Sequence, residues 1–245
     1  MGRQAQLDWK ESIPFILSSG ETIEVNIFVL LLSYSRFRVY RVSLSKTQDI
    51  LFSFLDDAFE TLGGIPDEIV TDNMKTVMDE ARTEYYAGKV NNKFQQFADD
   101  YGFKVHPCIA GHPHTKAKVE APMKILDEIR AYNGKLNYIE LVELVTRINN
   151  RVNTQVNQGT GRIPLMYYNK EKAFLNSLPA DNIRKPYQIT TNTVKVNHSS
   201  MFNYKSCQYS VPPEYIDKIV SLQVYGGYIV NAPTHVPTNT PKNLI

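Results

Sequence analysis

The sequence has few cysteines and no long apolar runs. Its two cysteines, Cys108 and Cys207, form no C-x-x-C pair, so they make no zinc ribbon between them, and a reduced, cytoplasmic protein is the simplest interpretation. His112 and His114 follow Cys108 closely, but no second ligand cluster accompanies them, which disfavours a zinc site. No stretch approaches the eighteen or more apolar residues of a membrane helix, and the N-terminus does not resemble a signal peptide.

A strong excess of either charge is also lacking. The formal net charge is +2, so the overall composition lacks the strong basic excess that indicates a nucleic-acid partner. The 245 residues, 42% hydrophobic and 21% charged, are typical of a soluble globular protein with one large domain and a small appendage. Basic residues do gather locally, which suits contact with phosphates, although a solvated surface explains each of them equally well. The two sets are Lys116, Lys118, Lys124, Arg130 and Lys135, with His112 and His114 beside them, and Arg184, Lys185, Lys195, Lys205 and Lys218.

Short runs rich in Val, Ile, Phe and Leu predict a five-stranded sheet. The first three strands form an antiparallel meander, and the last two are brief. The predicted strands are the segment around Asp8, Glu21 to Ser33, Arg36 to Leu44, Glu68 to Thr71, and Phe103 to His106.

Apolar residues at helical spacing predict the helices that flank this sheet. One runs from an N-cap at Ser45 to Leu62, where Gly63 and Gly64 end it. The others are Val90 to Tyr101, Lys116 to Tyr132, Asn137 to Val152, and Pro164 to Leu178. An α/β domain over residues 1–152 follows, joined to a helical linker over 153–185.

The C-terminal region has a different pattern. From Pro186 onward, short β-rich segments alternate with turn residues, which predicts a small SH3-like β-barrel over residues 186–231. Its strands are Gln188 to Val196, Gln208 to Val211, Ile219 to Val224 and Tyr228 to Asn231. Residues 232–245 are rich in proline and polar residues and are expected to form an extended tail.

Three carboxylates are candidates for a metal site. Asp8 and Asp72 lie on or directly after predicted strands, and Glu120 lies near the start of a predicted helix. Open α/β sheets place ligand sites beyond the C-terminal ends of strands, where Asp72 falls. Mg²⁺ prefers oxygen ligands, and two ions about 3.5–4 Å apart can activate an attacking oxygen and stabilise a leaving one. The alternative interpretation is a set of solvated caps and turn formers.

The residues around these carboxylates resemble a known family. Gln4 to Trp9 (QAQLDW), Thr71 to Thr76 (TDNMKT) and His114 to Glu120 (HTKAKVE) are similar, in order and spacing, to the three acidic motifs of IstA-type transposases. These enzymes belong to the DDE transposase and retroviral integrase superfamily. Tyr209 to Tyr215 (YSVPPEY) resembles the small β-domain that follows the core in this family. The resemblance therefore covers nearly the whole chain.

The resemblance implies a ribonuclease-H-like mixed sheet and metal-dependent phosphoryl transfer on DNA. The reaction comprises cleavage at transposon ends and transfer of the 3′-hydroxyl into target DNA, at a site with two Mg²⁺ ions for which Mn²⁺ can substitute. By the resemblance, Asp8, Asp72 and Glu120 are the catalytic residues and metal ligands. The residues it implies for DNA contact are Asn73, Lys75, His114, Lys116, Lys118 and Lys124.

The family also implies partners. These are transposon-end and target double-stranded DNA, further copies of the chain as a dimer or tetramer, and an AAA+ helper ATPase, all in the bacterial cytoplasm. Helix-turn-helix domains precede the core in this family, whereas Met1 to Arg3 leads directly into the first motif, which suggests that an upstream region is missing.

Three other functions compete with this one. A ribonuclease-H-like nuclease would use the same fold without strand transfer. A non-catalytic DNA-binding protein derived from a transposase would usually have lost one of the three acids. A structural or interaction domain would show neither metal dependence nor affinity for DNA.

Overall fold

The computed structural model describes residues 2–109, 126–189, 191–225 and 228–233. The chain divides into two compact units, Met1–Gln188 and Ile189–Ile245. In the described part of the chain, no helix is long and apolar enough to cross a membrane.

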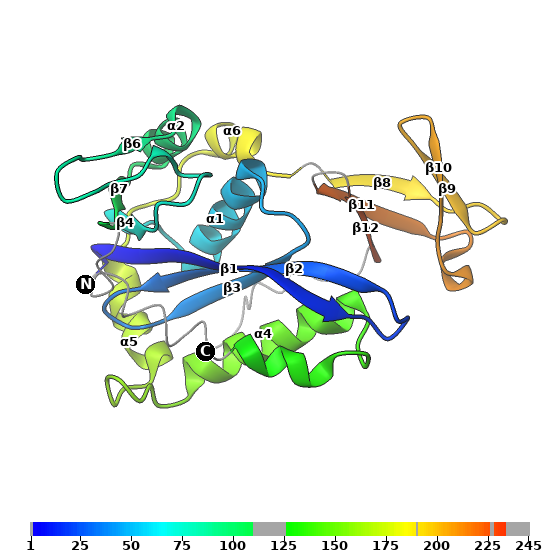
Figure 1. Cartoon of the computed structure of the whole chain (residues 1–245), viewed down its shortest axis with the longest axis horizontal. Helices are drawn as coiled ribbons and strands as arrows, with labels where there is room; N and C mark the ends of the chain where they lie inside the picture. Colours follow the sequence, from blue (N-terminus) through cyan, green and yellow to red (C-terminus); the bar gives the residue numbers. More distant parts are fainter. Residues whose placement is uncertain (1, 110–125, 190, 226–227, 234–245) are drawn as a thin grey trace. The chain divides into compact units, whose positions relative to one another are not determined.

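The first unit is built on a five-stranded mixed sheet, as the sequence predicts. The strands are β1 (Gln4–Ile16), β2 (Thr22–Leu32), β3 (Arg38–Ser43), β4 (Glu68–Thr71) and β7 (Lys104–Pro107), in the order β3-β2-β1-β4-β7 (Figure 1). The pairs β1–β2 and β2–β3 are antiparallel, and β1–β4 and β4–β7 are parallel. The strand β1, which carries Asp8, and the strand β4, which Asp72 follows, are therefore direct neighbours.

Both faces of the sheet are covered, which explains why β2 is almost continuously apolar. Val25, Ile27, Val29 and Leu31 lie on one face, in a buried cluster with apolar residues of η2 (Leu126–Tyr132) and α4 (Tyr138–Thr154). On the other face, Phe28 stacks on Phe54 of α1 (Gln48–Leu62), with ring centroids 5.2 Å apart. Figure 1 shows α1 on one side of the sheet and α4 on the other.

The helix ends are close to those predicted, with one error at a cap. The α1 helix ends at Gly63, whose φ of 62° suits a residue without a Cβ. Its N-cap is Thr47, so the prediction of Ser45 is wrong. The Ser45 backbone N–H instead donates to Ser43 Oγ (3.0 Å), which places Ser45 in the turn after β3. The capping box of α4 pairs Asn137 with Glu140.

Two further expectations about local structure need correction. The single helix predicted from Pro164 to Leu178 is α5 (Pro164–Glu171) followed by the 3₁₀ turn η3 (Lys172–Phe174). The helix stops because Asn176 forms an isolated antiparallel bridge with Ile65, which requires extended backbone. Of the helix predicted from Lys116 to Tyr132, residues 126–132 form a 3₁₀ helix, and residues before 126 lie outside the described part.

A small hairpin formed by β5 (Met78–Glu80) and β6 (Lys89–Val90) precedes α2 (Asn92–Tyr101). It was not predicted from the sequence. Helix α2 begins at Asn91, whose side chain accepts backbone N–H bonds from Lys93 and Phe94, and ends at Gly102.

Helix α5 packs on the sheet end through a buried carboxylate. Glu171 is fully buried, and its two oxygens accept the backbone N–H groups of Gly2 (3.1 Å) and Ser35 (3.0 Å). The Tyr168 hydroxyl donates to the carbonyl oxygen of Leu62 at the end of α1 (2.9 Å). These bonds tie α5 to three segments that are far apart in the sequence.

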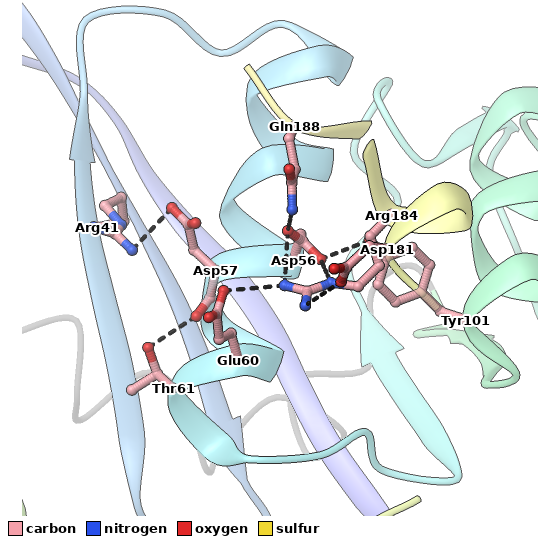
Figure 2. Close-up of polar contacts among 9 residues, drawn as sticks. All are labelled: Arg41, Asp56, Asp57, Glu60, Thr61, Tyr101, Asp181, Arg184 and Gln188. Carbon is pink, nitrogen blue, oxygen red and sulfur yellow. Dashed lines mark hydrogen bonds and ion pairs between the residues drawn. The ribbon is translucent and has the colours of Figure 1, made fainter. Parts of the chain in front are cut away.

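The segment that ends the first unit is attached through a buried ion pair (Figure 2). Asp56 on α1 is 1% exposed, and it accepts two hydrogen bonds from Arg184 of α6 (Asp181–Arg184), from Nε at 2.7 Å and from Nη2 at 3.1 Å. Tyr101 (2.7 Å) and Gln188 (2.8 Å) also donate to Asp56. The interpretation of Arg184 as part of a phosphate-contacting surface is therefore wrong, because Asp56 holds its guanidinium in the protein interior.

The second unit contains two small sheets in its described residues. One has the order β12-β11-β8, and the other is the β9–β10 hairpin. The buried residues Val196, Phe202, Val211, Val220 and Leu222 form a separate apolar core. The bounds are β8 (Thr191–Lys195), β9 (Met201–Tyr204), β10 (Cys207–Ser210), β11 (Ile219–Tyr225) and β12 (Tyr228–Pro233). The strand β9 was not predicted, and closure of the strands into a barrel stays a prediction.

Candidate active site

Asp8 lies in the middle of the central strand β1, opposite Val29 of β2. Residues opposite each other in an antiparallel pair share a face, so Asp8 belongs to the face that carries η2 and α4. Its side chain is half-buried, and its Oδ1 accepts the backbone N–H of Trp9 at 2.9 Å. Trp9 lies on the opposite face, where its ring packs against Phe28 at 4.9 Å.

Asp72 follows the last residue of β4, and the parallel register places it beside Asp8. Leu7 pairs with Thr71 in the β1–β4 ladder, so the next position on each strand is an aspartate. Neighbouring strands lie about 4.8 Å apart. Oδ1 of Asp72 accepts the backbone N–H of Asn73 at 2.8 Å, the same local arrangement as at Asp8. The structure thus brings together two carboxylates that are 64 positions apart in the sequence.

Asn73 ties the segment after Asp72 to two other parts of the unit. Its side-chain Nδ2 donates to the Cys108 carbonyl oxygen at 2.9 Å, and its Oδ1 accepts the Arg82 backbone N–H at 2.8 Å. The Arg82 guanidinium in turn donates to the carbonyl oxygen of Pro107 at 3.0 Å. The chain after β4, the end of β7 and the β5–β6 hairpin are therefore cross-linked directly next to Asp72.

Cationic side chains lie near the two aspartates. Lys75 is exposed in the turn after Asp72. Lys10, two positions after Asp8 on the same strand, pairs with Asp127 of η2 at 2.5 Å. The hydrogen bond from Lys10 lowers the pKa of the exposed Asp127 carboxyl. Sequence reasoning missed Lys10, whose partner Asp127 is 117 positions away, and Arg82, whose partners Asn73 and Pro107 lie 9 and 25 positions away in other segments.

The remaining site residues predicted from the sequence lie outside the described residues. They are Glu120, His114, Lys116, Lys118 and Lys124. The flanking residues are described: Cys108 donates its backbone N–H to the Thr71 carbonyl oxygen at 2.8 Å, and Leu126 is fully buried in the cluster that contains Val29. Within the described ranges, no group of three or more His, Cys, Asp or Glu side chains could hold a metal ion. The described part thus contains two of the three predicted carboxylates, Asp8 and Asp72.

Comparison with known proteins defines the class. Residues 2–113 match the family model described as the integrase core domain. The simian T-cell lymphotropic virus intasome, solved in complex with PP2A regulatory subunit B56 gamma, has a similar fold, with a TM-score of 0.53 and 17% identity over 95% of this chain and 76% of that chain. The chain carries an integrase core.

Closer relatives define the family within that class. The chain is 58% identical over 228 residues to the transposase for insertion sequence element IS232 of Bacillus thuringiensis subsp. berliner, covering 93% of this chain and 53% of the relative. It is 32% identical over 219 residues to a putative transposase for IS5376 of Geobacillus stearothermophilus, covering 89% and 53%. The chain belongs to the IstA-type insertion-sequence transposases, and the predicted resemblance is confirmed. It spans about half the length of these relatives.

Proposed function

We propose that this chain is the catalytic part of a DDE transposase, which cleaves DNA at transposon ends and joins the freed 3′-hydroxyl to target DNA. The observation that carries the proposal is the β1–β4 register, which sets Asp8 beside Asp72. Two adjacent acidic side chains on the central strands of a sheet are costly unless a cation or another donor compensates their charge. Membership of the insertion-sequence transposases supplies the reaction class.

The donor chemistry of these residues fits a hard cation. Carboxylate oxygens are the ligands that Mg²⁺ prefers, and strand-borne ligands hold their spacing well. We assign Asp8, Asp72 and Glu120 as catalytic metal ligands for two Mg²⁺ ions, with Mn²⁺ as a substitute. When bound, the ions supply activation of the attacking oxygen and stabilisation of the leaving oxygen. The positions of Cys108 and Leu126 support the inclusion of Glu120 in this site. Glu120 lies between them in the sequence, Cys108 is bonded to Thr71 beside Asp72, and Leu126 belongs to the cluster that contains Val29, the residue opposite Asp8.

The reaction has two steps, and each step forms one P–O bond and breaks another. Water attacks a phosphodiester at the transposon end, a new P–O bond forms, and the 3′-oxygen leaves as a hydroxyl. That hydroxyl then attacks a phosphodiester of the target, and the target's own 3′-oxygen leaves. No covalent bond to the protein is required in either step, so the side chains of this chain act by holding and orienting the reacting groups.

Basic and polar residues around the carboxylates are proposed to hold the DNA backbone. Lys75 is exposed close to Asp72 and suits a phosphate contact. Asn73 has protein partners at both ends of its amide, so a contact with DNA would use its second amide hydrogen or its second oxygen lone pair, or would replace one of these bonds. The other members of the proposed set are His114, Lys116, Lys118 and Lys124.

The wider assembly is proposed from the family. The partners are transposon-end and target double-stranded DNA, further copies of this chain in a dimer or tetramer, and an AAA+ helper ATPase, in the bacterial cytoplasm. The second unit, Ile189–Ile245, is proposed to close into a small SH3-like barrel, and the two sheets of its described residues are compatible with that arrangement.

Strand transfer of a pre-cut, labelled transposon end into plasmid DNA tests the proposal. The assay uses Mg²⁺ or Mn²⁺ and compares this chain with its variants Asp8→Asn, Asp72→Asn and Glu120→Gln. Joined product that disappears in all three variants, while DNA binding persists, is the expected result. Cleavage without joining would favour the ribonuclease-H-like nuclease, and full joining by any variant would remove that residue from the site.

A further inference from the structure

The hairpin formed by β5 and β6 is attached firmly to the core of the first unit. Val77 and Met78 at its start are buried, and the Val77 carbonyl oxygen accepts the backbone N–H of Asn91 at 2.8 Å. Gln48 at the start of α1 donates from its side chain to the carbonyl oxygen of Thr76 at 2.8 Å. The base of the hairpin is therefore fixed to both α1 and the N-cap of α2.

A second attachment connects the hairpin to the candidate active site. The Arg82 backbone N–H is bonded to the side chain of Asn73, the residue that follows Asp72, and the Arg82 guanidinium is bonded to Pro107 at the end of β7. Three residues of extended chain span at most about 10 Å. The Cα of Tyr85, three positions after Arg82, thus lies within about 10 Å of the Arg82 Cα.

The tip of the hairpin is held in one conformation by its own hydrogen bonds. Thr83 donates its backbone N–H to the carbonyl oxygen of Tyr86 at 2.9 Å, and Tyr86 returns its N–H to Thr83 Oγ1 at 3.1 Å. The Tyr86 hydroxyl donates to Glu80 at 2.6 Å. Gly88 has a φ of 75°, and a Cβ there would lie 2.8 Å from the Glu80 carbonyl oxygen, so the turn accepts only glycine without rearrangement.

This ordered turn presents Tyr85, whose side chain is 96% exposed. The turn carries acidic as well as basic side chains, which makes it poorly suited to phosphate binding. An aromatic ring can instead stack on a nucleobase that is unpaired or at a duplex end, and such stacking requires no charge and tolerates any base. A ring on a pre-ordered turn loses little conformational entropy when it binds.

We propose that Tyr85 stacks on a nucleobase of the DNA strand bound at Asp8 and Asp72. The hydrogen bond from Arg82 to the Asn73 side chain, and the step from Asn73 to Asp72, add roughly 10 Å, so the Tyr85 Cα lies within roughly 20 Å of the Asp72 Cα. Successive nucleotides of a strand are about 3.4 Å apart along the helix axis, so this distance corresponds to about six nucleotides. The stacked base is accordingly expected within about six nucleotides of the phosphate that is cut or joined. This inference rests on the proposed function, since it requires DNA at the two aspartates.

The test uses pre-cut transposon-end duplexes with 2-aminopurine placed in turn at each position, on either strand, within about six nucleotides of the reactive 3′-hydroxyl. Stacking on Tyr85 quenches the fluorescence of one of these probes in the wild-type complex. In Tyr85→Ala, that quenching disappears and the Kd for the end rises by about 5- to 150-fold. Tyr85→Phe retains the quenching and the affinity. Phe174→Ala, which removes a ring that is 59% exposed on η3, is the matched control and is expected to match wild type.

The outcomes separate this inference from the proposed function. If wild-type protein joins the pre-cut end while Tyr85→Ala keeps wild-type affinity and quenching at every position, the stacking proposal is overturned and the transposase proposal stands. If Phe174→Ala loses as much affinity as Tyr85→Ala, a specific contact is likewise refuted. Wild-type protein that neither binds nor joins the end overturns both proposals.

Discussion

The buried Arg184–Asp56 pair predicts a large loss of stability when its cation is removed. Asp56 is 1% exposed and receives two hydrogen bonds from Arg184 (Figure 2). The Arg184 guanidinium also bonds Glu60 at 3.0 Å. Arg184→Met leaves the Asp56 carboxylate buried with only its bonds from Tyr101 and Gln188 as described compensation.

Removing one partner of a buried ion pair typically costs about 3–5 kcal/mol, because the other charge stays buried without compensation. For a unit of this size, each kcal/mol shifts the Tm by about 2–4 °C, so Arg184→Met is expected to lower the Tm by about 6–20 °C. Arg184→Lys keeps the charge but not the two-pronged contact, and its Tm should fall between those of wild type and Arg184→Met.

Trp9 is the single tryptophan of the chain and lies in the first unit, so its fluorescence follows unfolding of that unit alone. The matched control is Arg41→Met, which removes an exposed pair with Asp57 (2.9 Å, both side chains 46% exposed) and should cost no more than about 1 kcal/mol. The reasoning is refuted if urea unfolding gives Arg184→Met and Arg41→Met the same loss. A double variant, Asp56→Leu with Arg184→Met, should recover most of the stability.

Three further predictions follow from other contacts. Burial, and secondly the hydrogen bond to Asp100, raise the pKa of Tyr187 to about 12, so the stabilisation that this hydroxyl contributes below pH 10 is lost between pH 10 and 12. Between pH 9 and pH 11.5, the free energy of unfolding measured in urea should therefore fall less in Tyr187→Phe than in wild type. Equal falls in the two proteins would contradict this prediction. Trp9 directly follows Asp8, so Mn²⁺ bound at Asp8 should quench its fluorescence, and Asp8→Asn should need an Mn²⁺ concentration at least about tenfold higher for half of that quenching. A wild-type protein whose fluorescence Mn²⁺ does not quench would count against the metal assignment. Glu171→Ala, which strips two buried N–H groups of their acceptor, should lower the unfolding free energy by about 2–4 kcal/mol, and an unchanged urea midpoint would show that water replaces the carboxylate.

The parts of the fold that the sequence predicts are those with a strong local pattern. Strand β2 is an almost continuous apolar run that stops at a polar turn, and α1 and α4 each have an apolar face at helical spacing. Asp8 and Asp72 could be proposed as a site from their positions at strands. Their adjacency depends on which strands pair and in what register, which no local pattern encodes.

Two of the errors have the same origin, namely partners that are remote in the sequence. The helix after Pro164 ends early because Asn176 bridges to Ile65. Arg184 looks like a surface base, yet its partner Asp56 is 128 positions away. The β5–β6 hairpin escaped prediction because its strands are two and three residues long, too short for an alternating pattern.

The pairing of β1 with β4 also determines when the candidate site can exist during synthesis. Asp72 is translated 64 residues after Asp8. At about 5–20 residues per second, the ribosome adds that stretch in about 3–13 s. The β4 strand can join β1 only after α1, which connects β3 to β4, has also emerged. A nascent chain therefore carries Asp8 for seconds without its neighbour, and a ribosome that stalls in this interval releases no fragment with both aspartates.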